Sequence, residues 1–116
     1  MGKNKDLVKI SEFYNKELIG SRLVIKDGIE IIDSYFFRNS IIKDVIFPKS
    51  LKVIDFWAFD GCKNIIDLIL NEGLEEIGNF AFQDCSNIER ITLPQSLRKI
   101  GDFAFWDCEY FSSWEV

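Results

Sequence analysis

A repeat of 23 residues runs through most of the chain. Three segments, which begin at Val45, Leu68 and Ile91, align without a gap: VIFPKSLKVIDFWAFDGCKNIID, LILNEGLEEIGNFAFQDCSNIER and ITLPQSLRKIGDFAFWDCEYFSS. An upstream segment from Leu23, LVIKDGIEIIDSYFFRNSIIKD, fits the same alignment with one residue missing after Ser40. A fixed period of this length indicates a solenoid, in which each unit covers the apolar face of the next.

Each unit contains a strand pattern followed by turn residues. In Ile65–Leu70 and Ile88–Leu93, apolar residues occupy the first, fourth and sixth places, and the last two alternate as one buried strand face requires. A proline, asparagine or lysine then ends the strand, and turn residues follow. The next apolar pairs are spaced by three, which favours a turn or a short helix: Leu51/Ile54, Leu74/Ile77 and Leu97/Ile100.

The unit ITLPQSLRKIGDFAFWDCEYF, from Ile91 to Phe111, resembles the bacterial leucine-rich repeat called BspA-like or Treponema-type. Its Ala-Phe-x-x-Cys element separates it from other leucine-rich repeats, and the resemblance covers the chain from Leu23 to the C-terminus. It implies an α/β repeat solenoid: a short right-handed coil with a parallel sheet on one face and short helices or turns on the other. It also implies a surface or secreted protein that binds other proteins or host components.

We expect one structural domain, with an N-terminal cap over residues 1–22 and a leucine-rich-repeat solenoid over residues 23–116. The units of the solenoid are 23–44, 45–67, 68–90 and 91–113, with a final strand to residue 116. Four apolar residues of the cap are spaced as on one face of an amphipathic helix: Leu7, Ile10, Tyr14 and Leu18. Phe36 stands where later units have alanine, so the first coil is expected to be distorted or to belong to the cap.

The three cysteines, Cys62, Cys85 and Cys108, occupy equivalent places in successive units. A structural zinc site needs four ligands, and a cysteine nucleophile needs a base, most often the histidine that this chain lacks. A disulfide framework favours an even number of cysteines. Ser40 takes the same place in the first unit, so size rather than thiol chemistry explains the position. We therefore expect a buried packing column, with no catalytic, metal-binding or cofactor-binding residue.

The same stacking predicts two more columns inside the solenoid. One is an aromatic stack of Phe37, Phe59, Phe82 and Phe105. The other marks where the backbone of a short helix approaches the sheet too closely for larger side chains, at Ala58, Ala81 and Ala104.

The formal net charge is −5, and the lysines and arginines are scattered along the chain. Binding to nucleic acid needs a concentrated basic face, so no direct nucleic-acid partner is expected. No apolar run approaches the roughly 20 residues that cross a bilayer, so no membrane partner is expected. The charged N-terminus has no apolar signal-peptide core. The chain as written is expected in the cytoplasm, and at the cell surface or secreted if a leader has been removed.

The outward side of the predicted sheet is the first candidate for a partner-binding surface. Residues between the buried strand positions point away from the core and form three columns. The columns are Arg22, Asp44, Asp67 and Arg90; Val24, Ile46, Ile69 and Thr92; and Lys26, Pro48, Asn71 and Pro94. The middle column is apolar in three of four units. An apolar stripe flanked by charges suits protein binding, and weak packing among neighbours explains it equally well.

Two further surfaces are candidates. One is an aromatic column, half-buried on the helical side of the coil, that could stack on a sugar or a partner: Tyr35, Trp57, Phe80 and Phe103, with Trp106 nearby. The other is a C-terminal edge that repeats the strand pattern and favours a homodimer or a partner contact: Phe111, Trp114 and Val116.

These features favour a non-enzymatic protein–protein interaction module that binds through the outward sheet face, the C-terminal edge, or both. One alternative is a small acidic inhibitor, of the kind that mobile elements encode, which occludes a basic site of a nucleic-acid enzyme. Another alternative is a carbohydrate-binding or host-binding fragment of a surface protein. Binding by charge would weaken steeply with salt, whereas an apolar contact would tolerate it.

Overall fold

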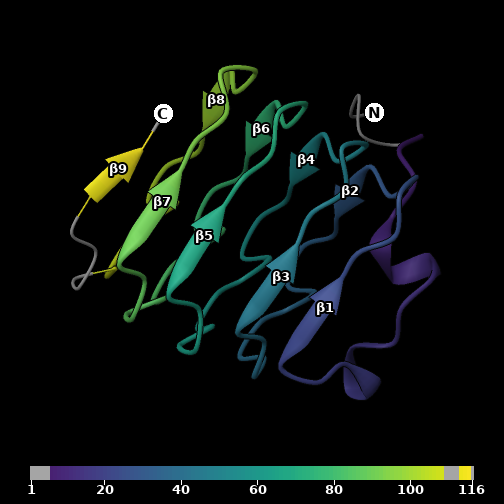
Figure 1. Cartoon of the computed structure of the whole chain (residues 1–116), viewed down its shortest axis with the longest axis horizontal. Coiled ribbons are helices and arrows are strands. Elements are labelled where there is room, and N and C mark those ends of the chain that lie inside the picture. Colours follow the sequence, from purple (N-terminus) through teal and green to yellow (C-terminus); the bar gives the residue numbers. More distant parts are fainter. Residues whose placement is uncertain (1–5, 109–112, 116) are drawn as a thin grey trace.

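The computed structural model describes residues 6–108 and the backbone of residues 113–115. The chain winds into a solenoid, and each coil contributes a three-residue strand to one side, here called the front wall (Figure 1). These strands are β1 (Arg22–Val24), β3 (Asp44–Ile46), β5 (Asp67–Ile69), β7 (Arg90–Thr92) and β9 (Ser113–Glu115). Strands of this wall that pair are parallel, with equivalent residues of successive coils opposite each other. The predicted repeat solenoid with a parallel sheet is confirmed.

A second parallel sheet lies behind the front wall and forms the second wall (Figure 1). Its strands are β2 (Ile31–Ile32), β4 (Val53–Ile54), β6 (Glu76–Ile77) and β8 (Lys99–Ile100), paired in the order β2-β4-β6-β8. The apolar pairs spaced by three were expected to form a turn or a short helix, and instead each pair runs from a turn into one of these strands. A strand of two residues is too short for the alternation that reveals strands in a sequence.

The third wall consists of turns, and none of its described residues is helical. It comprises residues 33–40, 55–62, 78–85 and 101–108. Its backbone N–H groups alternate between two kinds of acceptor. Those of Trp57 and Phe59 donate to carbonyls of the next coil, whereas those of Ala58 and Asp60 donate to carbonyls three residues earlier. Of the short helices or turns that the resemblance implies, turns are what form.

The first coil has the same backbone pattern as the later ones. The N–H groups of Tyr35 and Phe37 donate to the second coil at 3.1 and 2.7 Å, as their counterparts in that coil donate to the third. Phe36 packs edge-to-face on Phe37, with the ring centroids 4.8 Å apart. The expected distortion is therefore wrong. Ala58 has a coil on either side, whereas Phe36 belongs to the first coil, where no earlier coil limits its size.

The N-terminal cap is not an amphipathic helix, and that prediction is wrong. The cap contains two short 3-10 helices, Ile10–Glu12 and Lys16–Leu18. Ile10 is fully buried, but Leu18, expected on the same face, is 83% exposed. Backbone pairing holds the cap instead, since the carbonyl of Val8 accepts the N–H groups of Glu30 and of Ile31, the first residue of β2, at 2.8 and 3.0 Å. The cap therefore covers the first coil by extending the second wall, an arrangement that side-chain spacing does not reveal.

The front wall is interrupted between β3 and β5, which belong to separate sheets. Two irregularities of the repeat meet here. The corner that leads into β3 is one residue shorter than the corner that leads into β5, because of the missing residue after Ser40. Asp44 and Asp67, which begin the two strands, also carry like charges, and these disfavour direct cross-strand pairing. The departure from the 23-residue period thus coincides with the break in the sheet.

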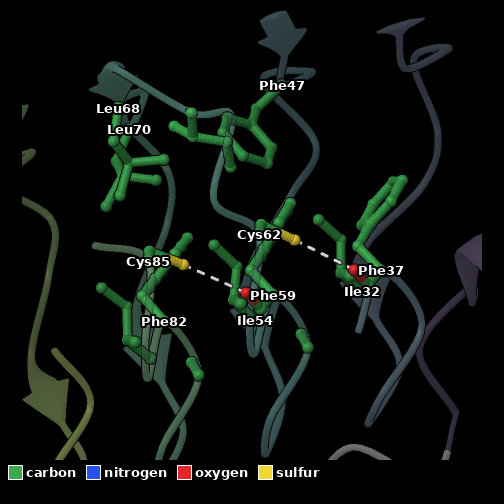
Figure 2. Packing of buried hydrophobic residues seen from close by; sticks show 14 of the residues in the cluster. Ile32, Phe37, Phe47, Ile54, Phe59, Cys62, Leu68, Leu70, Phe82 and Cys85 are labelled. Atoms are coloured by element: carbon green, nitrogen blue, oxygen red, sulfur yellow. Dashed lines mark hydrogen bonds between the residues drawn. The ribbon is translucent and has the colours of Figure 1, made fainter. Parts of the chain in front are cut away.

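The interior is built of stacked columns (Figure 2). Phe37, Phe59 and Phe82 are fully buried, and successive ring centroids lie 4.8 and 4.9 Å apart. Phe105 continues the stack, 5.3 Å from Phe82. The alanines of the third wall are buried as well: Ala58, Ala81 and Ala104. The predicted aromatic and alanine columns are confirmed.

Candidate interaction surfaces

The apolar column of the front wall lies at the surface. Val24, Ile46 and Ile69 are 67, 57 and 59% exposed. Leu68, between the two outward positions of β5, is buried, and Thr92 is partly buried. The middle residue of each strand thus packs inward while its neighbours face outward, as the strand pattern predicts.

Charged side chains of the same wall pair with one another. Arg22 Nε lies 3.6 Å from Asp44 Oδ2, and a guanidinium nitrogen of Arg90 lies 2.7 Å from Asp67 Oδ1. All four side chains are between 46 and 80% exposed, so each pair contributes at most about 1 kcal/mol to stability. The charges of this column cancel. The structure therefore places a row of charged side chains, with a net charge of zero, beside the apolar column.

The third predicted column is only partly at the surface. Lys26 is exposed, with its ammonium nitrogen 4.0 Å from the centre of the Phe13 ring. Pro48 and Pro94 are buried, so their predicted outward position is wrong. Asn71 is half-buried, and its side-chain N–H donates to a carbonyl of the preceding coil at 2.5 Å. The strands end two residues before these positions, so strand alternation no longer sets the direction of their side chains.

The cysteines are buried and donate hydrogen bonds. The thiols of Cys62, Cys85 and Cys108 donate to carbonyl oxygens of the phenylalanine column in the preceding coil, at 2.9, 3.1 and 3.2 Å. Figure 2 shows the first two of these bonds. Burial raises the pKa of Cys62 to about 12 and that of Cys108 to about 11, and it raises the pKa of Cys85 well above its ordinary value. A neutral thiol is a poor nucleophile and a poor metal ligand, which supports the packing interpretation.

The aromatic column of the third wall is a ladder of parallel rings. Centroids of Tyr35 and Trp57 lie 5.3 Å apart, those of Trp57 and Phe80 lie 4.7 Å apart, and those of Phe80 and Phe103 lie 5.4 Å apart. Trp106 packs edge-to-face on Phe103 at 5.0 Å. Tyr35, Phe103 and Trp106 are 45, 54 and 55% exposed, and the two inner rings are partly buried. The structure brings all five predicted residues together.

Asp60 is a buried carboxylate in the third wall. Its Oδ2 atom lies 3.1 Å from Arg38 Nε. Burial raises the pKa of Asp60, the charge of Arg38 opposes that shift, and the charge of Asp84 adds to it. The ionised form of Asp60 is therefore less favourable in the fold than in water.

Asp60→Asn is expected to raise the melting temperature at pH 7. The folded-state pKa of this carboxyl group exceeds its unfolded value of 3.8, so the group lowers stability as the pH rises from 3.8 through the folded-state pKa. Asparagine has no charge to bury, so the variant is more stable than the parent at pH 7, and this difference disappears below pH 3.8. Thermal unfolding followed by circular dichroism at both pH values measures the difference. A variant less stable than the parent at pH 7 would show that the pair with Arg38 outweighs the burial.

The C-terminal end of the second wall is open in the part of the chain that the structure describes. Ile100 of β8 is 45% exposed, although its counterparts Ile54 and Ile77 are fully buried. A hollow of about 370 Å³ lies at this end, lined by Leu93, Pro94, Gln95, Leu97, Arg98, Lys99 and Ile100. Apolar positions that are interior in earlier coils thus meet the surface here.

The front wall extends one strand further than the second wall. β9 pairs with β7, and Trp114 stands opposite Ile91. This register matches the strand pattern expected at the C-terminus. The predicted edge residues Phe111 and Val116, and the side chain of Trp114, lie outside the described residues.

The family model described as "BspA type Leucine rich repeat region (6 copies)" matches residues 8–116. The chain belongs to this BspA-type family. Leucine-rich repeats of this type are modules that typically bind proteins and are in general not enzymes. The chain has no match among curated protein sequences.

Solved structures share the fold of this BspA-type repeat. A leucine-rich repeat protein from Bacteroides ovatus is 31% identical, with a TM-score of 0.73, over 78% of this chain and 23% of that protein. TpLRR of T. pallidum is 19% identical, with a TM-score of 0.71, over 86% and 59%. A leucine-rich cell surface protein of Faecalibacterium prausnitzii is 22% identical, with a TM-score of 0.73, over 88% and 33%. The chain spans less than two thirds of each, and the last two show the fold alone.

The described residues of this BspA-type chain contain neither a candidate membrane-spanning helix nor a candidate metal site. None of its helices has the length and apolar character that a membrane span requires. The cysteine and acidic side chains of these residues form no group of three or more that could hold a metal ion.

Two aromatic residues among those that the structure describes in this BspA-type chain, Phe13 and Phe56, are exposed and were not predicted as surface residues. Phe56 is 47% exposed and packs edge-to-face on Trp57, with centroids 6.5 Å apart. It lies over Gly78 of the next coil, where an added Cβ would stand 2.8 Å from the ring. The signal was in the repeat: Gly78 takes the place that Asp55 occupies one coil earlier, which leaves room for the ring.

Proposed function

We propose that this chain is a non-enzymatic protein-interaction module that binds its partner through the front wall. The observation that carries the proposal is the row of Val24, Ile46 and Ile69, each more than half exposed on adjacent coils. Burying such a side chain contributes about 1.5–3 kcal/mol. The paired charges beside the row suit the polar rim of an interface.

The charge pattern favours an apolar contact over capture by charge. Asp44 and Asp67 are paired with arginines of the same wall, so this surface attracts a basic enzyme site only weakly. The acidic-inhibitor alternative predicts that partner binding weakens steeply with salt. It also predicts that binding is lost in the double variant Asp44→Lys and Asp67→Lys. The carbohydrate alternative requires exposed ring faces, and the faces of Trp57 and Phe80 are covered by neighbouring rings.

Ile46→Asp combined with Ile69→Asp is expected to weaken partner binding at least about tenfold, since two apolar contacts are lost and two charges would be buried. A partner captured by the parent chain from cell extract is titrated against each variant by calorimetry, at low and high salt. Ile41→Asp is the matched control, because Ile41 is 59% exposed but precedes β3 at a corner. Equal loss in the control, or unchanged binding in the double variant, would contradict the proposal.

A second candidate activity is self-association through the C-terminal end. It is favoured by the exposure of Ile100, at a position that the next coil covers elsewhere, and by the hollow of about 370 Å³ beside it. Within the described residues β8 pairs only with β6, and its other edge offers backbone groups for strand pairing with another copy. The opposite end of the second wall is already covered by the cap at Val8 and Lys9, so two copies would meet through their C-terminal ends.

Ile100→Asp is expected to shift a dimer to a monomer, because it places a carboxylate in the apolar contact. Light scattering at tens of micromolar chain measures the mass of parent and variant. Ile41→Asp is again the control for an exposed isoleucine elsewhere. A monomeric parent at this concentration would exclude self-association through this end.

A further inference from the structure

An exposed aromatic strip runs along the third wall, apart from the front wall. It consists of Tyr35, Trp57, Phe80 and Phe103, one from each coil, with Phe56 and Trp106 at its sides. Four of these six rings are between 45 and 55% exposed. The four ladder residues also take φ values of 54–66°, a left-handed conformation that is disfavoured for residues with a bulky side chain. A surface that is both apolar and strained is a candidate for binding.

The strip presents ring edges rather than ring faces. Trp57 lies between two rings at 3° and 4° to its own plane, and Phe103 stacks on Phe80 and makes a T-shaped contact with Trp106. Arg38 lies over the ring of Tyr35, 5.4 Å from its centre. A sugar or a cation needs a free face for stacking. Aliphatic side chains can pack on ring edges, so an apolar protein segment fits this surface.

Aspartates accompany the strip on both sides. Asp33, Asp55 and Asp102 precede ladder residues by one or two positions, and Asp107 follows Trp106. Asp33 accepts hydrogen bonds from Ser11, and Asp55 accepts one from the N–H group of Phe56. No salt bridge joins any of the four to a cation within the described residues, whereas Asp60 and Asp84 of the same wall pair with Arg38 and Lys63. The front wall differs, because its aspartates are paired with arginines. The excess negative charge of the chain is thus concentrated beside the aromatic strip.

We infer that the aromatic strip is a second docking surface, whose occupant is a basic amphipathic protein segment. Apolar side chains of that segment pack on the ring edges, and its lysines or arginines reach the neighbouring aspartates, which form no salt bridge within the described residues. Charge complementarity selects this occupant, since an acidic or neutral apolar segment would leave the aspartates unpaired or repelled. The surface is separate from the front wall, so each is testable without the other.

A short amidated peptide of leucine and lysine, with leucines at helical spacing, serves as the probe. Calorimetry gives the affinity, and amide chemical shifts of the labelled chain map the contact. We expect shifts centred on Trp57, Phe80 and Phe103. Peptides with glutamate for lysine, or serine for leucine, are expected to bind at least about tenfold more weakly, because each removes one half of the recognition.

Two matched variants separate this surface from general attraction to an acidic chain. Asp102→Lys and Asp27→Lys change the net charge equally, and both positions are exposed, but Asp27 lies in a turn after the front wall. We expect Asp102→Lys to weaken binding about tenfold and Asp27→Lys less than about twofold. Trp106→Ala, at a 55% exposed position, should also weaken it about tenfold without unfolding the chain. Equal effects of the two lysine variants, or shifts centred on Val24 and Ile46, would overturn the inference.

Discussion

Phe59→Ala is expected to lower the free energy of unfolding by about 3–5 kcal/mol, a loss comparable to the whole stability of many small domains. Phe59 is fully buried between Phe37 and Phe82, with ring centroids 4.8 and 4.9 Å away, and the ring of Phe47 meets it edge-on at 5.9 Å. Alanine removes contacts on both sides and leaves a cavity in the middle of the stack. Backbone hydrogen bonds within the walls fix the spacing of the neighbouring coils, so these coils cannot easily move together to close that cavity.

Phe103→Ala is the control for this change, because Phe103 also stacks in a column but is 54% exposed. Its expected loss is about 1 kcal/mol, since water fills the vacated space. Chemical denaturation of parent and variants, with tryptophan emission as the signal, measures both values. Losses of similar size would mean that the interior stack contributes no more than the surface ladder, against the burial seen in the structure.

The repeat period predicted the columns but not every wall. A residue that recurs at the same place in each coil must stack on its counterpart, so the positions of Phe59, Cys85 and Ile69 followed from alignment alone. The second wall was missed because its strands contain two residues each, and no pattern fits in so short a segment. The cap was mispredicted for a related reason: Val8 binds the first coil through its carbonyl, and backbone pairing leaves no trace in side-chain spacing.

The candidate surfaces were predictable to different degrees. Strand alternation placed Val24 and Ile46 outward correctly, and it failed at Pro48 and Pro94, where the strand had already ended. The aromatic ladder was visible as a column, but the coverage of its ring faces depends on ring planes that sequence does not specify. The contrast between a neutral front wall and an acidic third wall also needed side-chain positions, because the aspartates of both walls recur in the same repeat.

Gly73→Ala is expected to destabilise the fold by about 2–5 kcal/mol, although it adds a single methyl group. Gly73 has a φ of +106° in the turn between the front and second walls, where a side chain is strained. An added Cβ would also stand 2.8 Å from the carbonyl oxygen of Lys49 in the coil before. That oxygen belongs to the backbone, so no rotation of a side chain relieves the contact. The turn itself is tied to the coil after, because the N–H group of Gly73 donates to Ser96 Oγ at 2.9 Å.

Gly28→Ala separates the two causes of this loss. Gly28 occupies the same place in the first coil, with a φ of +101° and a similar bond to Ser50 Oγ at 2.9 Å, but nothing lies within 4 Å of its added Cβ. It therefore measures backbone strain alone, which we expect at about 1–2 kcal/mol. The difference between the two variants reports how rigidly one coil is held against the next. Equal losses in thermal and chemical unfolding would mean that the third coil moves away from Lys49 at little cost. A larger loss at Gly73 would mean that the spacing of coils is fixed by backbone contact as well as by the stacked side chains.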